Sequence, residues 1–241
     1  MAEWLFDLGN TRLKCAPLED GRVGEGFAVA HDGRALPDDW AAALPAWVDS
    51  AVLASVAPAP LRASLLAALG GRCGRLSRVQ TQAEFAGMRI AYAHPERLGV
   101  DRFLALIGAH ARGPGPWLLV GVGTALTIDL LDRDGCHRGG RIAPSPALMR
   151  ESLHRRAHLP LRGGRAVAFA DDTADALASG CEGAACALVE ASRRDAMALT
   201  GTMPTVLVHG GGAGSVLAGI DDAIAAPTLV LEGIARWARV Q

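Results

Sequence analysis

An aspartate, a glycine turn and a lysine lie close together near the start of the sequence, in the segment WLFDLGNTRLK of residues 4–14. Asp7 ends an apolar stretch, and we expect its carboxylate at the edge of a sheet, where it could hold Mg²⁺ directly or through water. Gly9 lets the backbone approach phosphate oxygens, and the Asn-Thr pair after it offers hydrogen-bond donors. Lys14 is the only lysine of the chain, and its ammonium group suits a phosphate as a mobile point charge. The pattern indicates phosphate binding.

The same pattern also has a purely structural interpretation. Gly, Asn and Asp dominate turns because of their own conformational preferences, so the segment could be a simple hairpin with a solvated lysine. A second block, WLLVGVGTA, resembles the first when Gly9 is set on Gly123. The same shift sets the Asp-Gly turn at Asp20 on the one at Asp134. Both blocks predict a strand, a glycine turn, a strand, a hairpin turn and a third strand, and this duplication favours phosphate binding.

Helical and strand patterns surround the two blocks. Apolar residues at three- and four-residue spacing predict helices at residues 60–69, 101–112, 146–154 and 173–193. Short apolar strands are expected at residues 51–56 and 205–209. Strands mixed with helices, some joined as hairpins, indicate an α/β fold with mixed sheets. The glycine- and proline-rich residues 112–116 form the expected hinge between an N-terminal half, residues 1–113, and a C-terminal half, residues 114–241.

A second group of polar residues precedes the helix expected at residues 101–112. Tyr92 is the only tyrosine of the chain, and the sequence Gly-Val-Asp-Arg leads into the helix. Asp101 could simply cap the helix N-terminus, and its spacing alone favours that role. Alternatively, its carboxylate accepts the proton of a substrate hydroxyl while Arg102 pairs with an anionic group of the substrate.

Further segments in the C-terminal half carry weaker signals. The run HGGGAG of residues 209–214 follows an expected strand, and it could carry an adenosine or form a crowded strand-to-helix turn. Gly139-Gly140 is typical of a close backbone approach. Thr173 is expected to cap the N-terminus of the helix that follows it.

Composition excludes several classes of function. The chain has 241 residues, half of them hydrophobic, and a formal net charge of -1 at pH 7. Its charge gives no electrostatic footprint for nucleic acid or a membrane surface, so a small molecule is the expected partner. No apolar run approaches the roughly 20 residues that span a bilayer, and no signal peptide is expected. The five cysteines have no disulfide or metal spacing and the histidines do not cluster, so we expect free thiols, a cytoplasmic location and no histidine-bound metal.

Taken in order along the chain, these motifs resemble those of the type III pantothenate kinases, a family of the acetate and sugar kinase, Hsp70 and actin superfamily. The matching segments are a first phosphate motif at residues 7–14, a pantothenate motif at 98–102, a second phosphate motif at 123–129, and residues 139–144 and 172–173. The resemblance covers nearly the whole chain. It implies two similar ribonuclease H-like halves with mixed sheets, as in the actin-like ATPases, and a nucleotide cleft between the halves. The first phosphate motif and the pantothenate motif would belong to the N-terminal half, and the second phosphate motif and an adenosine loop to the C-terminal half.

The resemblance also implies roles for individual residues. Asp101 would be the catalytic base toward the pantothenate hydroxyl. The positions that would contact pantothenate are Tyr92, Gly99, Val100, Arg102 and Thr173. The positions that would contact ATP and its Mg²⁺ are Asp7, Leu8, Gly9, Asn10, Thr11, Arg12, Leu13, Lys14 and Thr124. In this family the threonine at the position of Thr173 reaches the substrate pocket across a dimer interface, so a homodimer is implied.

The sequence departs from the family pattern at Gly121. Family members usually carry an aspartate there, three residues before the threonine of the second phosphate motif, and it binds a monovalent cation, K⁺ or NH₄⁺. Without this carboxylate, the cation requirement is either met by backbone carbonyls or absent. The Pro-Gly turn that is common in the family is also replaced, by Pro144-Ser145, which we interpret as a local variation.

The implied activity is ATP-dependent phosphorylation of the primary alcohol of pantothenate to 4'-phosphopantothenate, the first step of coenzyme A biosynthesis. One alternative is another small-molecule kinase of the same superfamily, against which Tyr92 and the Gly-Val-Asp-Arg motif argue. The other is a non-catalytic accessory factor of transcription related to this family. A pure regulator would not need Asp7, Lys14 and Asp101 together, so their retention favours an enzyme.

Overall fold

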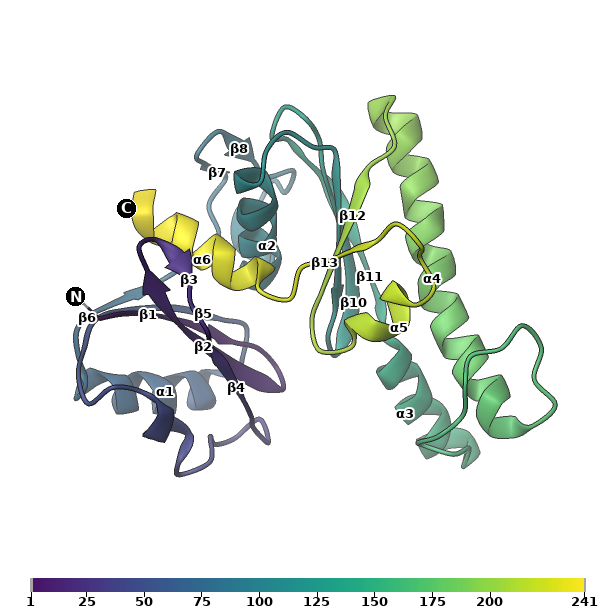
Figure 1. Cartoon of the computed structure of the whole chain (residues 1–241), viewed down its shortest axis with the longest axis horizontal. Helices are drawn as coiled ribbons and strands as arrows, with labels where there is room; N and C mark the ends of the chain where they lie inside the picture. Colours follow the sequence, from purple (N-terminus) through teal and green to yellow (C-terminus); the bar gives the residue numbers. More distant parts are fainter. Residues whose placement is uncertain (1, 241) are drawn as a thin grey trace. The chain divides into compact units, whose positions relative to one another are not determined.

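The computed structural model describes residues 2–240, and the chain divides into two compact units (Figure 1). The first unit contains Met1–Gly113 and Thr228–Gln241, and the second contains Pro114–Pro227. The last helix, α6 (Leu229–Val240), packs against α2 (Val100–Ala111) within the first unit. The expected C-terminal half of residues 114–241 therefore differs from the second unit, because the chain returns to the first unit at Thr228.

The first unit is built on a mixed sheet with the strand order β3-β2-β1-β5-β6, in which β4 also pairs with β2. Strand β1 is antiparallel to β2 and parallel to β5, which is parallel to β6. These strands are β1 (Glu3–Leu8), β2 (Arg12–Glu19), β3 (Arg22–Val23), β4 (Phe27–Ala30), β5 (Val48–Ser55) and β6 (Cys73–Arg78). The other elements, besides α2 and α6, are η1 (Trp40–Ala43), α1 (Ala59–Gly70), β7 (Glu84–Phe85), β8 (Met88–Arg89) and η2 (Pro95–Arg97).

The second unit is built on a five-stranded mixed sheet with the order β11-β10-β9-β12-β13. Strand β9 is antiparallel to β10 and parallel to β12, and β10 is antiparallel to β11. The strands are β9 (Trp117–Val122), β10 (Ala125–Leu131), β11 (His137–Pro144), β12 (Thr205–His209) and β13 (Ile224–Ala225). The helices are α3 (Pro146–Ala157), α4 (Thr173–Thr200) and α5 (Ala213–Leu217).

The two sheets share one topology. In each, an antiparallel hairpin is extended by further antiparallel pairing on one side and by two parallel strands on the other. Strands β1, β2, β5 and β6 thus correspond to β9, β10, β12 and β13, and α1 connects β5 to β6 as α5 connects β12 to β13. The predicted α/β fold of two similar halves with mixed sheets is confirmed, and the predicted helices and strands are present with shifted boundaries.

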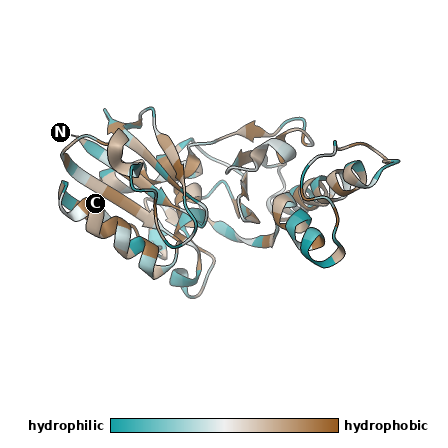
Figure 2. Cartoon of the chain, turned by 90° about the horizontal axis from the view of Figure 1, so that it is seen from below, coloured by the Kyte–Doolittle hydropathy of each residue, from teal (hydrophilic) through white to brown (hydrophobic). Residues whose placement is uncertain are grey.

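Side-chain alternation along the strands separates a packed face of each sheet from the face that carries polar residues. In the first unit, Phe6 and Leu8 join a core with Leu61, Leu65 and Leu69, which recur every four residues along α1. Asp7 lies between them in sequence, so its side chain is on the opposite face of β1. Helices α2 and α6 pack against this sheet on the side away from α1 (Figure 1). The strands near the labelled chain ends are largely hydrophobic (Figure 2). The second unit has an equivalent core between its sheet and helices α4 and α5, with Leu118, Val120, Val122, Val189 and Val216.

Two further expectations concern the chain as a whole. Within residues 2–240, no helix is long and apolar enough to cross a membrane. The five cysteines are free thiols, as predicted, and burial raises the pKa of the Cys15 thiol far above its usual value.

Candidate active site

The hairpin of β1 and β2 brings Asp7 and Lys14 together. Their strands pair so that Asp7 lies directly opposite Lys14, on the same face of the sheet. Lys14 Nζ is 4.0 Å from Asp7 Oδ2. The turn between the strands is closed by the Gly9 N–H, which donates to the Arg12 carbonyl at 3.0 Å. The hairpin predicted from the sequence is therefore present, and it pairs the carboxylate with the ammonium.

The environment of Asp7 disfavours its negative charge. Its side chain is buried, and burial is the main reason that its pKa is raised to about 6. The Lys14 ammonium acts in the opposite direction, and the negative charge of Asp101 raises the pKa further. Asp7 and Asp101 are therefore close enough to interact, although 94 positions of sequence numbering separate them. Two coupled carboxylates beside one ammonium favour the binding of a further cation.

Asp101 lies in the first turn of α2 and does not cap it. The N-cap residue is Gly99, which has no side chain to donate or accept a hydrogen bond, so the predicted capping role of Asp101 is wrong. Asp101 Oδ1 accepts a hydrogen bond from the backbone N–H of Arg102 at 2.8 Å. A Cβ atom on Gly99 would lie 2.6 Å from the same oxygen, so a larger residue at this position would displace the carboxylate. The helix dipole favours a negative charge at this end of α2.

Tyr92 and Arg102 form a pair next to Asp101. Arg102 is 8% exposed, and its Nη1 donates to the Tyr92 hydroxyl at 3.2 Å. The guanidinium carbon also lies 5.9 Å from the centroid of the Tyr92 ring. The residues predicted to contact pantothenate in the first unit thus gather at the start of α2. We call Tyr92, Gly99, Val100, Asp101 and Arg102 the α2 cluster.

His31 supports the first glycine turn and was missed by sequence reasoning. It follows β4, whose antiparallel pairing with β2 places it beside the turn. Its Nε2 lies 3.0 Å from the Gly9 carbonyl oxygen, and its Nδ1 accepts a hydrogen bond from the Gly33 N–H at 3.1 Å. Because Nδ1 is the acceptor, Nε2 carries the proton and donates to Gly9. A lone histidine in a loop has no sequence signal that would have predicted this contact.

The second glycine turn is exposed and is hydrogen-bonded to Ser145, the N-cap residue of α3. Thr124 lies at its tip, exposed, between β9 and β10, and the Gly123 N–H donates to the Ala125 carbonyl at 2.9 Å. Ser145 Oγ donates to the Thr124 carbonyl at 2.9 Å and accepts from the Leu148 N–H at 3.3 Å. The change to Pro144-Ser145 is thus more than a local variation, since Ser145 joins the turn to the N-terminus of α3.

The glycine loop after β12 is crowded against the end of β9. The Gly212 N–H donates to the Val122 carbonyl at 2.9 Å. Gly210 has φ 98°, and a Cβ atom there would lie 2.4 Å from the same carbonyl oxygen. These contacts support the crowded strand-to-helix turn as an explanation of the glycines, while the binding of an adenosine stays a prediction.

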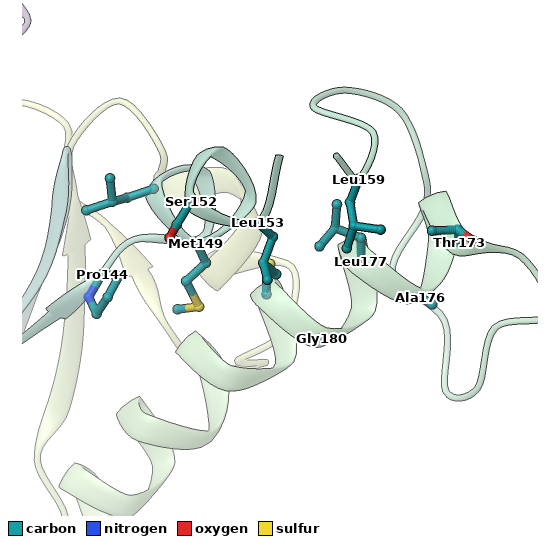
Figure 3. A pocket seen from close by; sticks show the side chains of 11 residues that line it. Pro144, Met149, Ser152, Leu153, Leu159, Thr173, Ala176, Leu177 and Gly180 are labelled. Carbon is teal, nitrogen blue, oxygen red and sulfur yellow. The ribbon is translucent and has the colours of Figure 1, made fainter. Parts of the chain in front are cut away.

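Thr173 is the first residue of α4 and lines a cavity in the second unit. The predicted capping role of Thr173 is wrong, because Asp172 Oδ1 accepts from the N–H groups of Ala174 and Asp175 at 2.7 and 3.0 Å. The cavity has a volume of about 790 Å³ and lies between α3 and α4. Figure 3 shows apolar side chains between these helices, with Thr173 at one end and Pro144 at the other. Thr173 and the α2 cluster belong to different units of the chain.

The residues present offer Mg²⁺ only a partial set of ligands. Within the described residues 2–240, no group of three or more His, Cys, Asp and Glu side chains could hold a metal ion. Asp7, coupled to Asp101, supplies carboxylate oxygen in a buried setting, and oxygen is the ligand that Mg²⁺ prefers. Such a site suits an ion that keeps waters and binds phosphate oxygens, rather than a fully caged structural metal.

Comparisons with known proteins identify the family of the chain. Residues 4–195 match the model of the type III pantothenate kinase family. A protein of Stenotrophomonas maltophilia named type III pantothenate kinase is 53% identical over 239 residues, which cover 99% of this chain and 98% of the relative.

Two solved structures resemble the chain at much lower sequence identity. A structure from Campylobacter jejuni named "conserved putative Baf family transcriptional activator" has a TM-score of 0.64 and 19% identity, over 99% of this chain and 100% of its own. An archaeal actin homolog has a TM-score of 0.53 and 11% identity, over 100% of both chains. These two likenesses show the actin-like fold alone. The family model and the close relative show that the chain belongs to the type III pantothenate kinase family.

Proposed function

We propose that this protein phosphorylates pantothenate with ATP to give 4'-phosphopantothenate, the first step of coenzyme A biosynthesis. Family membership supports the reaction. The observation that carries the proposal is the pairing of Asp7 with Lys14 at 4.0 Å in the same unit as the α2 cluster. The negative charge of Asp101 also raises the pKa of Asp7. A kinase needs phosphate-binding groups and an acceptor-orienting carboxylate within reach of one another.

Asp101 is the group that we assign to the pantothenate hydroxyl. Phosphoryl transfer has a loose transition state, so the enzyme contributes mainly position and charge. A carboxylate is a weak base toward an alcohol, and Asp101 therefore orients the hydroxyl and takes its proton late in the reaction. Its place at the start of α2 holds it against Gly99 and the Arg102 N–H.

Arg102 and Tyr92 are assigned to substrate recognition. Pantothenate carries one carboxylate, and a guanidinium pairs with such a group through two parallel hydrogen bonds. Arg102 is nearly buried and is held by the Tyr92 hydroxyl, so its charge is presented in a fixed direction. Gly99 and Val100 are the further substrate contacts that we assign to the α2 cluster.

The two glycine turns and Lys14 are assigned to the phosphates of ATP. Residues 7–14 and Thr124 are the proposed contacts, with Lys14 as the mobile positive charge. Asp7 would hold Mg²⁺ directly or through water, and Mg²⁺ bound there would offset the negative charge of the phosphates. Gly210 to Gly212 is the proposed place for the adenosine. The first turn and the α2 cluster belong to the first unit, and Thr124 and the glycine loop belong to the second.

A homodimer is the proposed assembly. The cavity between α3 and α4 is lined mainly by apolar side chains, and Leu153, Leu161 and Phe169 are exposed in the same unit. Exposed apolar side chains and an apolar hollow in one unit favour a protein partner. Thr173, at one end of the cavity, would then reach the substrate pocket of a second copy. The free thiols favour a reducing compartment, and we propose the cytoplasm.

A coupled assay of ADP release with and without pantothenate tests the proposed reaction. We expect ADP formation only when pantothenate is present, with a phosphorylated product of matching mass. ADP release at the same rate without pantothenate, or with a sugar or acetate in its place, would contradict the substrate assignment.

A further inference from the structure

Three residues form a row across the sheet of the second unit, beside the second glycine turn. Gly121 on β9 lies opposite Thr127 on β10 and opposite His209 on β12. The corresponding row in the first unit is Lys14, Asp7 and Ala54. The second row therefore has no side chain where the first has a carboxylate, and an imidazole where the first has a methyl group.

The side chains of Thr127 and His209 close over Gly121 from both sides. A Cβ atom built on Gly121 would lie 2.6 Å from Thr127 Oγ1 and 3.1 Å from both Cε1 and Nε2 of His209. The first distance is too short for a real Cβ, and the other two are tight. An aspartate at residue 121 would therefore require the neighbouring side chains to move. The absence of a side chain at Gly121 leaves the space that the His209 ring occupies.

The monovalent cation that family resemblance implies at this place does not fit these residues. K⁺ is held in proteins by several oxygen atoms, as in rings of backbone carbonyls. Here the expected carboxylate is missing and the space above Gly121 is taken by an imidazole edge and one hydroxyl. An imidazole nitrogen suits transition metals rather than an alkali cation.

His209 is also fixed to the strands that carry the second turn. It ends β12, and the residues after it bind the end of β9, where the Gly212 N–H donates to the Val122 carbonyl at 2.9 Å. Gly123 and Thr124 follow Val122 directly. A displacement of the His209 ring would thus shift the second glycine turn, which we assign to phosphate binding.

We propose that His209 and Thr127 replace the cation site of the family, so that the enzyme uses ATP without a monovalent cation and His209 positions the second glycine turn. This inference rests on the proposed function, because it concerns ATP bound for transfer to pantothenate. His209 is a positioning residue in this account, and no step of the reaction passes through a bound cation.

The first test is pantothenate-dependent ADP release by the wild-type protein at constant ionic strength. Choline, Na⁺, K⁺ and NH₄⁺ are compared as the only monovalent cation. We expect turnover to vary by less than about twofold, within the range of a general salt effect on exposed charges. Activation by K⁺ or NH₄⁺ of roughly tenfold or more over choline, which corresponds to ~1.4 kcal/mol, would overturn the proposal.

The second test is a pair of variants of His209 with a control elsewhere in the unit. His209→Ala is expected to raise the KM for ATP by roughly tenfold, while the KM for pantothenate stays within about twofold. His209→Asn keeps a polar side chain of smaller size and should recover part of the loss. His158→Asn, at an exposed helix end with φ 55° that asparagine tolerates, is the control. An unchanged KM for ATP in a folded His209→Ala protein would overturn the positioning role.

A binding measurement separates this inference from the proposed function. Calorimetry with a non-hydrolysable ATP analogue needs no acceptor substrate, so it reads out even if pantothenate is not phosphorylated. We expect the same affinity in choline and in K⁺ for the wild type, and weaker binding for His209→Ala. Tighter binding in K⁺ would overturn the inference, whereas absent pantothenate-dependent turnover with cation-independent binding would contradict only the proposed function.

Discussion

The two glycine-turn hairpins have the same strand directions but place different chemistry beside their turns. In the first, Leu8 pairs with Leu13, and the row before the turn contains Asp7 opposite Lys14. In the second, Val122 pairs with Leu126, so the turn is one residue shorter, and the row contains Gly121 opposite Thr127. Both halves thus have a glycine turn between antiparallel strands, whereas the charged pair occurs only in the first.

Each turn is also held by a different side chain. His31 donates to the Gly9 carbonyl, and Ser145 donates to the Thr124 carbonyl. The two residues come from different elements, since His31 follows β4 and Ser145 precedes α3. The turns thus occupy corresponding positions in the two sheets, but a different residue stabilises each turn. The effects of substitutions should follow this division between a charged hairpin and an uncharged one.

The largest effect is expected from Asp101, whose negative charge acts on Asp7 in the charged hairpin. Asp101→Asn should lower kcat by roughly 10²–10⁴-fold, because the acceptor hydroxyl loses its orienting carboxylate. Binding of ATP, measured by calorimetry, should persist. Glu96→Gln, an exposed change of the same kind, is the control. Near-normal turnover of Asp101→Asn would remove this residue from the mechanism.

Asp7→Asn should stabilise the protein when Mg²⁺ and nucleotide are absent. Burial raises the pKa of Asp7 from 3.8 to about 6, so the folded state holds a proton that the unfolded state has already released. The free energy of unfolding therefore falls as the pH rises through this interval and stays low above it. At pH 8 the variant should gain up to roughly 3 kcal/mol, and at pH 3.5 it should gain little.

Denaturant unfolding at the two pH values, in the presence of EDTA, measures this difference. Asp38→Asn, which is exposed in the same unit, controls for the removal of a charge. Equal stability changes at both pH values would show that the carboxylate of Asp7 carries no burial penalty. The same variant should lose activity, since it removes the proposed Mg²⁺ ligand.

The matched pair of Lys14→Ala and Thr127→Ala compares the two hairpins directly. Lys14→Ala should lower kcat/KM for ATP by roughly 30-fold, because a charge-assisted contact to phosphate contributes about 2 kcal/mol. Its effect on the KM for pantothenate should be small. Thr127→Ala should cost less than Lys14→Ala, since it removes a hydroxyl rather than a charge. Equal losses for ATP and pantothenate in Lys14→Ala would indicate a structural role.

The smallest effects are expected at the two residues that hold the turns. His31→Ala and Ser145→Ala should each lower the free energy of unfolding by about 1 kcal/mol, the net contribution of a hydrogen bond. Each should also raise the KM for ATP by a small factor. Thermal unfolding and steady-state kinetics measure both quantities. If either variant changed the KM for pantothenate alone, the turns would not be the elements that these residues support.

The predicted helices and strands follow from local sequence patterns, and they are present in the structure. Asp7, Gly9 and Lys14 are adjacent in one hairpin, so residue type and spacing were sufficient to place them. The caps could not be decided locally. Asp172 and Thr173 are both good capping residues, and the cap of α2 is a glycine, Gly99, set by its backbone conformation.

The features that sequence reasoning missed depend on long-range pairing. His31 reaches the first turn because β4 pairs with β2, and His209 faces Gly121 because β12 pairs with β9. The return of α6 to the first unit depends on its packing against α2. The alignment of the two blocks did not reveal that the second glycine turn is shorter. The hairpin turn that follows it, between Asp132 and Cys136, is longer than the corresponding turn at Asp20, so the Asp-Gly pairs of the two halves still align.

One measurement tests the central claim most directly: ADP release by the wild type and by Asp101→Asn, with and without pantothenate, at saturating MgATP. The account predicts pantothenate-dependent turnover in the wild type, and its loss by roughly 10²-fold or more in the variant, while ATP still binds. Turnover by the wild type that does not depend on pantothenate, or that survives the substitution, would contradict it.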